Sequence, residues 1–475
     1  MKTRLSVFVL LLSILAVSIY SCEERISKNN NTISPDGNWE SVGYGRILKI
    51  DSTGSFVLSD VSPFSCLPLM EGNLSDMGEN LTLSQDTISL EDGINRYFFT
   101  RINELPGSCI VDNTEITRDP ILNFEVLWNT FNDHYAYFEL RKINWDSIYE
   151  IYRPVISQST TDVELYRVLD EMISAMNDGH VGLDAPDEIV DAAIIKSEYP
   201  TEVTIKNYGN HEVAKLVADS YIPEGSLAHK ELLRWGVLEN NIGYIQLNQM
   251  MGLAVYNISD SLTGRDYWMA YFEQSDQSID DTSDEVNGIR NSMKTVMEDI
   301  AETEAVIIDV RFNGGGKDEV GMEVLRHFNS NRKTVFTKKA RFGSGFTPRI
   351  EIKQDGTTNY YSKPVFLLIS GESASATEIM VLCSLSMDNI TRIGSNTEGV
   401  FSDVLDKALP NGWEFGLSNE LYEDMNGRNY EGVGIAPDID LNYPRNKQEF
   451  LRYIVNALSK NGDAAIETII DRYSQ

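Results

Sequence analysis

Hydrophobic and polar positions follow three different patterns along this chain. Residues 37–112 alternate short apolar runs with turn residues, which is typical of antiparallel β-strands. We expect this segment to form a small β-barrel or sandwich. Because it carries no cluster of catalytic side chains, we assign it an accessory role, such as spacing, substrate capture or lid formation. The predicted strands lie at 46–50, 55–58, 81–83, 87–90 and 97–100.

From residue 121 onward the apolar positions recur every three to four residues, which predicts helices. Aromatic residues dominate the first stretches, and a regular apolar stripe follows over residues 165–176. This stripe is typical of a helix that packs on a core, not of a cofactor site. We therefore assign residues 117–195 to a helical subdomain.

The third pattern combines short, continuous apolar runs with helical stretches. The runs at 242–247, 305–310 and 365–369 predict buried strands, and helical patterns follow the second and third of them. This alternation indicates α/β layering. We assign residues 196–475 to an α/β core with a helical insert near 255–300.

Ser375 lies between the last of these strands and the apolar helix that follows. A helix N-terminus presents unpaired N–H groups and the positive end of the helix dipole. Acyl transfer needs such a place, because the serine alkoxide and the tetrahedral oxyanion are both negative. The alternative interpretation is that Ser375 is only an N-cap, with Glu378 completing a capping box.

Three consecutive glycines, Gly314 to Gly316, follow the predicted strand 305–310. Glycine lets the backbone approach a ligand closely. Neither GxxxxGK[ST] nor GxGxxG occurs in this stretch, so an oxyanion pocket fits better than a phosphate cradle. We expect the N–H groups of Gly315 and Ala376 to bind the oxygen of the reacting carbonyl.

A serine hydroxyl needs a base, and His180 has a suitable setting. It lies in the glycine-flanked stretch Asn-Asp-Gly-His-Val-Gly, just after the helix predicted to end near Met176. Loops on a rigid scaffold are where catalytic side chains tend to lie. A lone histidine is more commonly structural or exposed, so this loop alone leaves both interpretations open.

The composition excludes several classes of function. A net charge of −32 argues against a nucleic-acid partner and against passive adhesion to anionic lipid, because phosphates would be repelled. The five histidines are scattered and no CxxC pair or His/Cys cluster occurs, so we expect no metal site and no cofactor. The 42% hydrophobic content is that of a folded protein.

Residues 1–21 have the features of a targeting segment. Two basic residues precede an apolar run over 5–17, which is too short to span a bilayer. The segment ends in Ile-Tyr-Ser-Cys, which resembles a bacterial lipobox, so Cys22 would become the lipid-modified first residue of the mature protein. An ordinary secretory cleavage site is the alternative. With residues 22–36 as a flexible tether, we expect a lipid-anchored protein of the bacterial cell envelope, on the periplasmic side or at the cell surface.

Three cysteines follow Cys22. Cys66 and Cys109 can form one disulfide in an oxidising compartment. Cys383 lies within the apolar helix after Ser375 and is better interpreted as a small buried hydrophobe.

Three motifs of this chain together resemble peptidase family S41, the family of C-terminal processing and tricorn-core proteases. The motifs are Asp-Val-Arg-Phe-Asn-Gly-Gly-Gly at 309–316, Ser-Ala-Ser-Ala-Thr-Glu at 373–378, and Glu-Gly-Val-Gly-Ile-Ala-Pro-Asp at 431–438. The resemblance covers roughly residues 120–475. It implies a ClpP/crotonase-like α/β core, with Ser375 as the nucleophile and Gly315 and Ala376 as oxyanion donors.

The family uses two kinds of base, and this sequence departs from one of them. The processing branch has a lysine soon after a Gly-x-x-Thr-x-Gly stretch, which is 394–399 here, but Val400 stands where that lysine would be. A valine accepts no proton, so a serine–lysine dyad would require Lys407 to bend back.

The tricorn-like branch of the family uses a histidine oriented by a glutamate, and His180 and Glu431 match these positions. A carboxylate behind the imidazole would hold its tautomer and stabilise the imidazolium. Glu398 and Asp388 are competing candidates for the orienting acid. Glu431 as a mere surface acid is the remaining alternative.

The processing branch typically carries a PDZ domain between its two halves. Residues 184–235 are too short for one and lack a convincing carboxylate-binding loop, so we do not expect recognition of substrate C-termini. The insert near 255–300 is a candidate cap over the active site instead.

The resemblance predicts an envelope-anchored serine endopeptidase that cleaves a peptide or protein substrate through a Ser-His-Glu triad and an acyl-enzyme. An esterase with the same triad and a non-catalytic ligand-binding relative are the alternatives. The sequence leaves the cleavage preference and the oligomeric state open.

Overall fold

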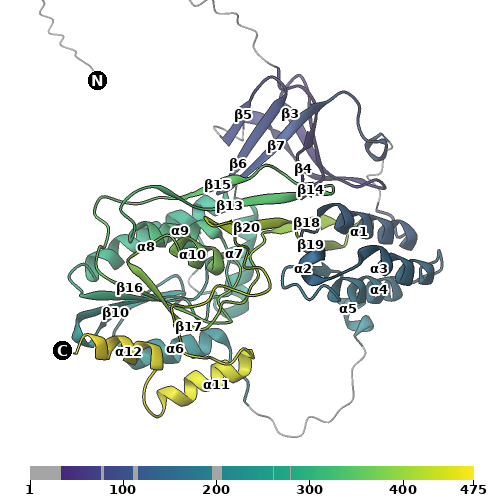
Figure 1. Cartoon of the computed structure of the whole chain (residues 1–475). Coiled ribbons are helices and arrows are strands. Elements are labelled where there is room, and N and C mark those ends of the chain that lie inside the picture. The colour runs from purple at the N-terminus through teal and green to yellow at the C-terminus, as the bar shows by residue number, and fades with distance from the viewer. Residues whose placement is uncertain are drawn as a thin grey trace, which may run out of the picture. The chain divides into compact units, whose positions relative to one another are not determined.

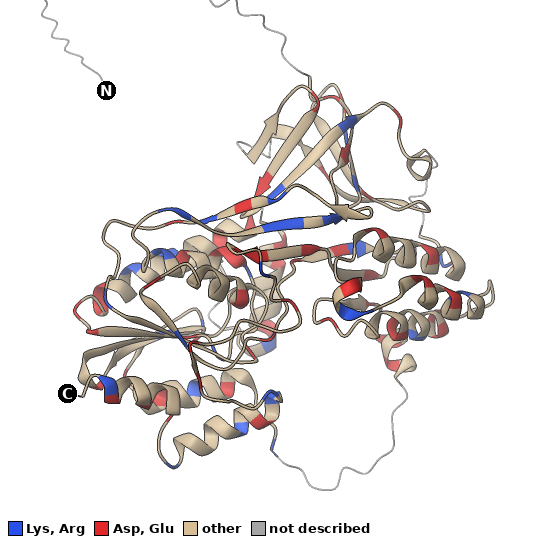
Figure 2. Ribbon diagram, in the orientation of Figure 1, with Lys and Arg blue, Asp and Glu red and all other residues tan. Residues whose placement is uncertain are grey.

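The computed structural model describes residues 34–75, 80–110, 116–194, 206–259, 261–278 and 280–474 (Figure 1). The predicted targeting segment, Cys22 and most of the predicted tether lie outside these residues. Acidic residues outnumber basic ones by 72 to 40, and Figure 2 shows both signs distributed over strands and helices. Within the described residues, no helix is long and apolar enough to cross a membrane.

The N-terminal part is one seven-stranded antiparallel sheet with strand order β4-β3-β2-β1-β7-β6-β5. Trp39 of the central strand is fully buried in its small apolar core. Pairing among the described residues leaves β4 and β5 as free edges, where the sequence suggested a closed barrel or two stacked sheets. The strands are β1 (Gly37–Ser41), β2 (Arg46–Ile50), β3 (Ser55–Val61), β4 (Cys66–Asn73), β5 (Leu81–Leu83), β6 (Thr87–Asp92) and β7 (Asn95–Ile102).

A group of helices around an aromatic core follows this sheet. Pro120 at the first helical position and the Asp119 side chain at the N-cap begin the first helix, and a Thr161–Glu164 capping box begins the fourth. Phe131 lies at the centre of the core and stacks on Phe415 of a later strand. The helices are α1 (Pro120–His134), α2 (Phe138–Arg141), α3 (Trp145–Tyr152), α4 (Asp162–Ser174) and α5 (Asp187–Ala193).

The central element of the rest of the chain is a second seven-stranded sheet, with order β21-β17-β16-β12-β11-β10-β9. Strands β11, β12, β16, β17 and β21 pair in parallel, while β9, β10 and β11 pair antiparallel. The strands are β9 (Ser226–Ala228), β10 (Leu233–Leu238), β11 (Ile242–Leu247), β12 (Ala305–Asp309), β16 (Val365–Ile369), β17 (Ile390–Gly394) and β21 (Ile439–Asp440).

Helices cover both faces of this sheet (Figure 1). On β12, Ile307 packs with one set of helices and Ile308 with the other, because successive strand residues point to opposite faces. One set consists of α6 (Asn210–Tyr221), α11 (Lys447–Leu458) and α12 (Ala464–Arg472), and the other of α8 (Asp281–Asp299), α9 (Asp318–Arg326) and α10 (Ala376–Ser384). Helix α7 (Gly264–Asp276) precedes α8 in the predicted insert.

Two smaller sheets complete the described structure. Strand β13 (Lys333–Phe342) pairs with β14 (Gly345–Phe346), β15 (Ile350–Gln354) and β20 (Glu420–Asp424). Strand β19 (Glu414–Ser418) pairs with β18 (Val404–Ala408) and with β8 (Gly182–Asp184). The β8–β19 pair fixes the chain immediately after His180.

Candidate active site

His180 and Ser375 lie in hydrogen-bond contact although 195 residues separate them in the sequence. The distance from His180 Nε2 to Ser375 Oγ is 3.1 Å. Ser375 stands at the junction of β16 and α10, and His180 stands in the loop between α4 and β8. A base at this distance can accept the hydroxyl proton.

The backbone at Ser375 has a conformation that is rare for a residue with a side chain, with φ 54° and ψ −126°. Residues in such regions cost about 1–3 kcal/mol and cluster at active sites. Ser375 occupies the N-cap position of α10, but its side chain makes no capping bond within the described residues. Glu378 accepts hydrogen bonds from the Gly399 and Val400 N–H groups instead. The capping-box interpretation of this serine is therefore wrong.

Asp178 fixes the loop that carries His180. One of its carboxylate oxygens accepts the His180 backbone N–H at 3.0 Å and the Ser418 hydroxyl at 3.0 Å. The other accepts the Tyr135 hydroxyl at 2.9 Å. These bonds connect the loop to β19 and to the end of α1, so the backbone that carries the imidazole is held by the scaffold.

Burial lowers the pKa of His180 below its ordinary value of 6.5, which favours the neutral form that can act as a base. The charges of Asp178 and Asp403 and the Ser402 backbone act in the opposite direction. The Nδ1 atom of His180 is buried, and no group in the described part of the chain meets hydrogen-bond geometry there.

Glu431 is buried close to the histidine loop, but its contacts go to other groups. One carboxylate oxygen lies 2.9 Å from the Arg141 guanidinium, and the other accepts the Phe401 N–H at 2.8 Å. Burial, reinforced by the charge of Asp178, raises the pKa of Glu431 to about 7. The contacts within the described residues therefore include no hydrogen bond between Glu431 and His180.

Arg141 connects these two carboxylates. Its guanidinium lies 3.2 Å from Asp178 as well as 2.9 Å from Glu431, and it donates to the backbone carbonyl of Asn177. The Asp178 and Glu431 side chains are inaccessible to solvent. A charge placed between two buried acids offsets much of their mutual repulsion.

The glycine-rich loop after β12 lies against the serine. A Cβ atom added at Gly315, where φ is 111°, would lie 2.8 Å from the Cβ of Ser375, so only glycine fits there. The Gly315 N–H donates to the Asn313 side-chain oxygen at 2.9 Å, and the Asn313 carbonyl accepts the Ala374 N–H. An oxyanion role for Gly315 requires a substrate carbonyl to replace the Asn313 side chain. Ala376 begins α10 directly after the serine, as the sequence suggested.

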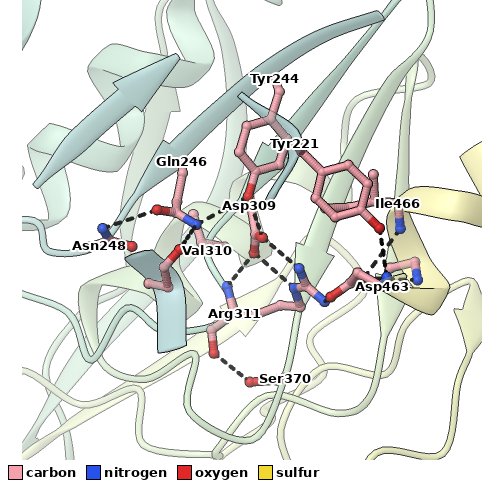
Figure 3. Close-up of polar contacts among 12 residues, drawn as sticks. Tyr221, Tyr244, Gln246, Asn248, Asp309, Val310, Arg311, Ser370, Asp463 and Ile466 are labelled. Carbon is pink, nitrogen blue, oxygen red and sulfur yellow. Dashed lines mark hydrogen bonds and ion pairs between the residues drawn. The ribbon is translucent and has the colours of Figure 1, made fainter. Parts of the chain in front are cut away.

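A buried ionic network lies where the glycine-rich loop leaves β12, beside the loop that leads from β16 to Ser375 (Figure 3). Arg311 bonds to Asp309 of β12 at 2.6 Å and to Asp463, the N-cap of α12, at 2.8 Å, and none of the three side chains is accessible to solvent. The Tyr244 hydroxyl donates to Asp309 from the neighbouring strand. Ser370 then ties the loops together, because its hydroxyl donates to the Arg311 carbonyl at 2.6 Å.

Lys407 does not reach the serine. Its ammonium group lies 2.6 Å from Asp60 of β3 and donates to the carbonyls of Tyr44 and Gly45. Val400 packs beside the histidine loop, where a Cβ added at Gly179 would lie 3.2 Å from it. Of the two candidate bases, Lys407 and His180, the one in contact with Ser375 is therefore His180.

Cys66 and Cys109 are joined by a disulfide, with Cα atoms 5.0 Å apart, and Cys383 is free and buried. Over the described ranges, no three His, Cys, Asp or Glu side chains are grouped to hold a metal ion.

Comparison with known proteins fits this geometry. The family model of peptidase family S41 matches residues 241–441, which include β12, the glycine-rich loop, Ser375 and Glu431. The model of the tricorn protease C1 domain matches residues 122–174, immediately before the histidine loop. The middle of this chain is therefore similar to peptidase family S41.

One curated relative is the carboxy-terminal-processing protease of Bartonella bacilliformis, which is 29% identical over 138 residues. That match covers 29% of this chain and 31% of the relative. A candidate peptidase of Parabacteroides merdae has a solved structure with a TM-score of 0.55 at 21% identity, covering 76% of this chain and 98% of that one. Mature CPAF gives a TM-score of 0.51 at 11% identity, covering 75% and 98%. At these identities the two structures show a shared fold.

Sequence reasoning missed the residues that hold the site. Asp178 carried a signal, because an Asp two residues before a histidine in a glycine-containing turn commonly bonds to the backbone. Asn313 lies inside the recognised motif, but its bond to the Gly315 N–H depends on a side-chain orientation that no pattern reveals. Arg141 gave no signal, because its partners are 37 and 290 residues away.

Proposed function

We propose that the protein is a serine endopeptidase in which His180 removes the Ser375 hydroxyl proton as the oxygen attacks a peptide carbonyl. A bond forms between Oγ and the carbonyl carbon, and the C–N bond then breaks as His180 returns the proton to the leaving amine. Water, deprotonated by the same imidazole, releases the acyl group. The 3.1 Å contact between Ser375 and His180 carries this proposal.

The remaining groups of the site fit supporting roles. The Ala376 N–H at the start of α10 and the Gly315 N–H are the oxyanion donors of the proposal. Glu431 is the third member of the proposed triad and acts on His180 indirectly. It accepts the Phe401 N–H beside Ser402, and the Ser402 backbone in turn favours the charged form of His180. On this proposal, the protein uses the histidine base of the tricorn-like branch.

Labelling by a fluorophosphonate probe tests the nucleophile and the base. We expect Ser375→Ala to abolish labelling and His180→Ala to slow it by about 100-fold or more. The chain offers a matched control, because His229 and Ser292 form a second histidine–serine contact at 2.8 Å. Ser292→Ala should label like the wild type. Strong labelling of Ser375→Ala would overturn the assignment.

Mass-spectrometric profiling of a diverse peptide library tests the substrate class. The endopeptidase proposal expects cuts inside peptides that disappear in Ser375→Ala. A labelled protein that cuts no peptide but hydrolyses small acyl esters would be an esterase, and one that does neither would be a binding protein.

We also propose that Cys22 is lipid-modified and anchors the protein in the bacterial envelope. The support is the lipobox-like Ile-Tyr-Ser-Cys after an apolar segment. Metabolic labelling with a fatty-acid probe should mark the wild type, and Cys22→Ser should lose both the label and sedimentation with membranes. A Cys22→Ser variant that still carries the label would contradict this.

A further inference from the structure

A cavity of about 680 Å³ opens beside the glycine-rich loop, on the side formed by helix α7. This volume is in the range of pockets that enclose small ligands. Its wall is mostly apolar and aromatic, and none of the described residues that line it is Asp or Glu. The apolar wall includes Leu232, Met251, Tyr267, Trp268, Phe272 and Phe312.

Helix α7 is fixed in place by a buried tyrosine. The Tyr271 hydroxyl donates to Glu285 of α8 at 2.7 Å and accepts the Ala254 N–H at 2.8 Å. On the face beside Tyr271, Trp268 and Phe272 are one helical turn apart, with ring centroids separated by 6.2 Å. Phe272 is 40% exposed, so it lies at the rim of the cavity and remains accessible to a ligand.

Two amide side chains at the cavity have an unused acceptor. Asn248 donates through its NH₂ group to the Gln246 side chain and to the Glu231 carbonyl, and Asn210 donates to Glu372 and the Phe312 carbonyl. These partners are acceptors, so the remaining atom of each amide must be oxygen. Both oxygens are buried and find no donor in the described part of the chain, and Asn248 is only 6% exposed. Because both oxygens are shielded from solvent, the two amides hold the cavity wall and present no open acceptor to a ligand.

The cavity lies close to the candidate active site along the glycine-rich loop. Gly314 lines it, and the next residue, Gly315, lies against Ser375. Met250 pairs with this loop through two backbone hydrogen bonds. Its N–H donates to the Gly315 carbonyl, and its carbonyl accepts the Lys317 N–H.

We propose that this cavity is the subsite for a large apolar or aromatic side chain next to the scissile bond of a peptide substrate. The apolar wall buries that side chain. The Lys230 ammonium group, 4.7 Å from the Tyr267 ring centroid, is the cation at the cavity wall and disfavours lysine and arginine. This inference rests on the proposed peptidase function and deepens it.

The test compares cleavage of a peptide library by the wild type and by variants of helix α7, reading the residues on both sides of each cut. The wild type should prefer Phe, Tyr, Leu or Met at one flanking position and avoid Lys and Arg there. Phe272→Ala and Trp268→Ala should each lower kcat/KM for those peptides by at least about tenfold, with a much smaller change for peptides with Ala at that position. Met269→Ala is the matched control, because Met269 lies on the same helix, is 59% exposed and points elsewhere.

A change of preference cannot be mimicked by poor folding. We therefore include Phe272→Asp, which places a carboxylate at the half-exposed rim and should admit Lys or Arg at the selected position. Unchanged preferences in Phe272→Ala, Trp268→Ala and Phe272→Asp would overturn the subsite while leaving the peptidase in place. A wild type that a small fluorophosphonate does not label would instead overturn the proposed function, and the subsite with it.

Discussion

Glu431 is paired with Arg141 across 290 residues of sequence, at 2.9 Å, with the glutamate side chain wholly buried. The same guanidinium lies 3.2 Å from Asp178, the residue that fixes the backbone of His180. Arg141 thus joins the loop of the proposed base to the loop of the proposed third residue. Its role is positioning, because it touches neither Ser375 nor the His180 ring within the described contacts.

Arg141→Ala should slow fluorophosphonate labelling per folded molecule by about 100-fold, because the histidine loop would lose its bridge to Glu431 and shift. It should also lower the free energy of unfolding by about 3–5 kcal/mol, since two buried acids would lose their cation. Arg141→Lys restores the charge but not the branched geometry, so it should recover part of both losses. If Arg141→Ala loses stability but labels at the wild-type rate, Arg141 is only structural.

The pH dependence of labelling distinguishes two roles of Glu431. Burial lowers the pKa of His180, so we expect the rate to fall with decreasing pH at an apparent pKa below 6.5. Glu431→Gln should lower the rate at every pH and leave this apparent pKa in place, because the Glu431 contacts reach His180 only through the backbone. The opposite result is an apparent pKa of the labelling rate near 7 in the wild type and below 6.5 in Glu431→Gln. That result would show that the ionised carboxylate acts directly on the imidazole.

Glu431 also affects the pH dependence of stability. Its pKa is about 7 in the folded protein and 4.5 as a free side chain, so between these pH values the folded state holds a proton that the unfolded state has released. The free energy of unfolding should therefore fall as pH rises from 4.5 to 7, by about 3 kcal/mol from this group. In urea unfolding, the free energy of unfolding should decrease less between pH 5 and pH 7 in Glu431→Gln than in the wild type. Parallel curves for the two proteins would contradict the raised pKa.

Much of the α/β part could be predicted because its strands are short apolar runs with clear boundaries. The predicted strands 242–247 and 365–369 coincide with β11 and β16, and the strand predicted over 305–310 is β12, one residue shorter. Such runs are buried on both faces, so composition alone identifies them. The ClpP/crotonase-like assignment and the domain boundaries remain predictions.

Other strands could not be found from local pattern. Six of the ten residues of β13 are charged or polar, yet Lys338 within it is only 1% exposed. Its buried charge is offset by Glu420 of β20 at 2.9 Å. A buried lysine cannot be inferred without knowing its partner, which lies 82 residues away. The same argument applies to the site: the motifs identify Ser375 and His180, but Arg141 follows only from the fold.

The Cys66–Cys109 disulfide closes a loop with a sequence separation of 43 residues in the N-terminal sheet. A cross-link of this span stabilises a fold by about 4 kcal/mol through the unfolded state. Reduction, or the double change Cys66→Ser and Cys109→Ser, should lower the unfolding midpoint observed by circular dichroism. Labelling of Ser375 should be unchanged below that midpoint, because the described contacts of the two cysteines include neither Ser375 nor His180. Reductant should have no effect on the double variant, and an effect there would mean that another group is being reduced.

The Arg311–Asp463 pair connects the C-terminal helix α12 to the strand that precedes the glycine-rich loop. Asp463→Leu removes the N-cap of α12 and one of the two anions around a fully buried guanidinium, so it should lower the free energy of unfolding by about 3–5 kcal/mol. The double variant Arg311→Met and Asp463→Leu leaves Asp309 without a cation, but it also removes the buried guanidinium that Asp463→Leu alone would leave with one anion. The two changes should therefore be non-additive in urea unfolding.

Because the Arg311 carbonyl holds Ser370, we also expect both variants to label more slowly than the wild type at temperatures where they are fully folded. Additive losses of stability with a wild-type labelling rate would mean that the network supports α12 alone and does not position the nucleophile.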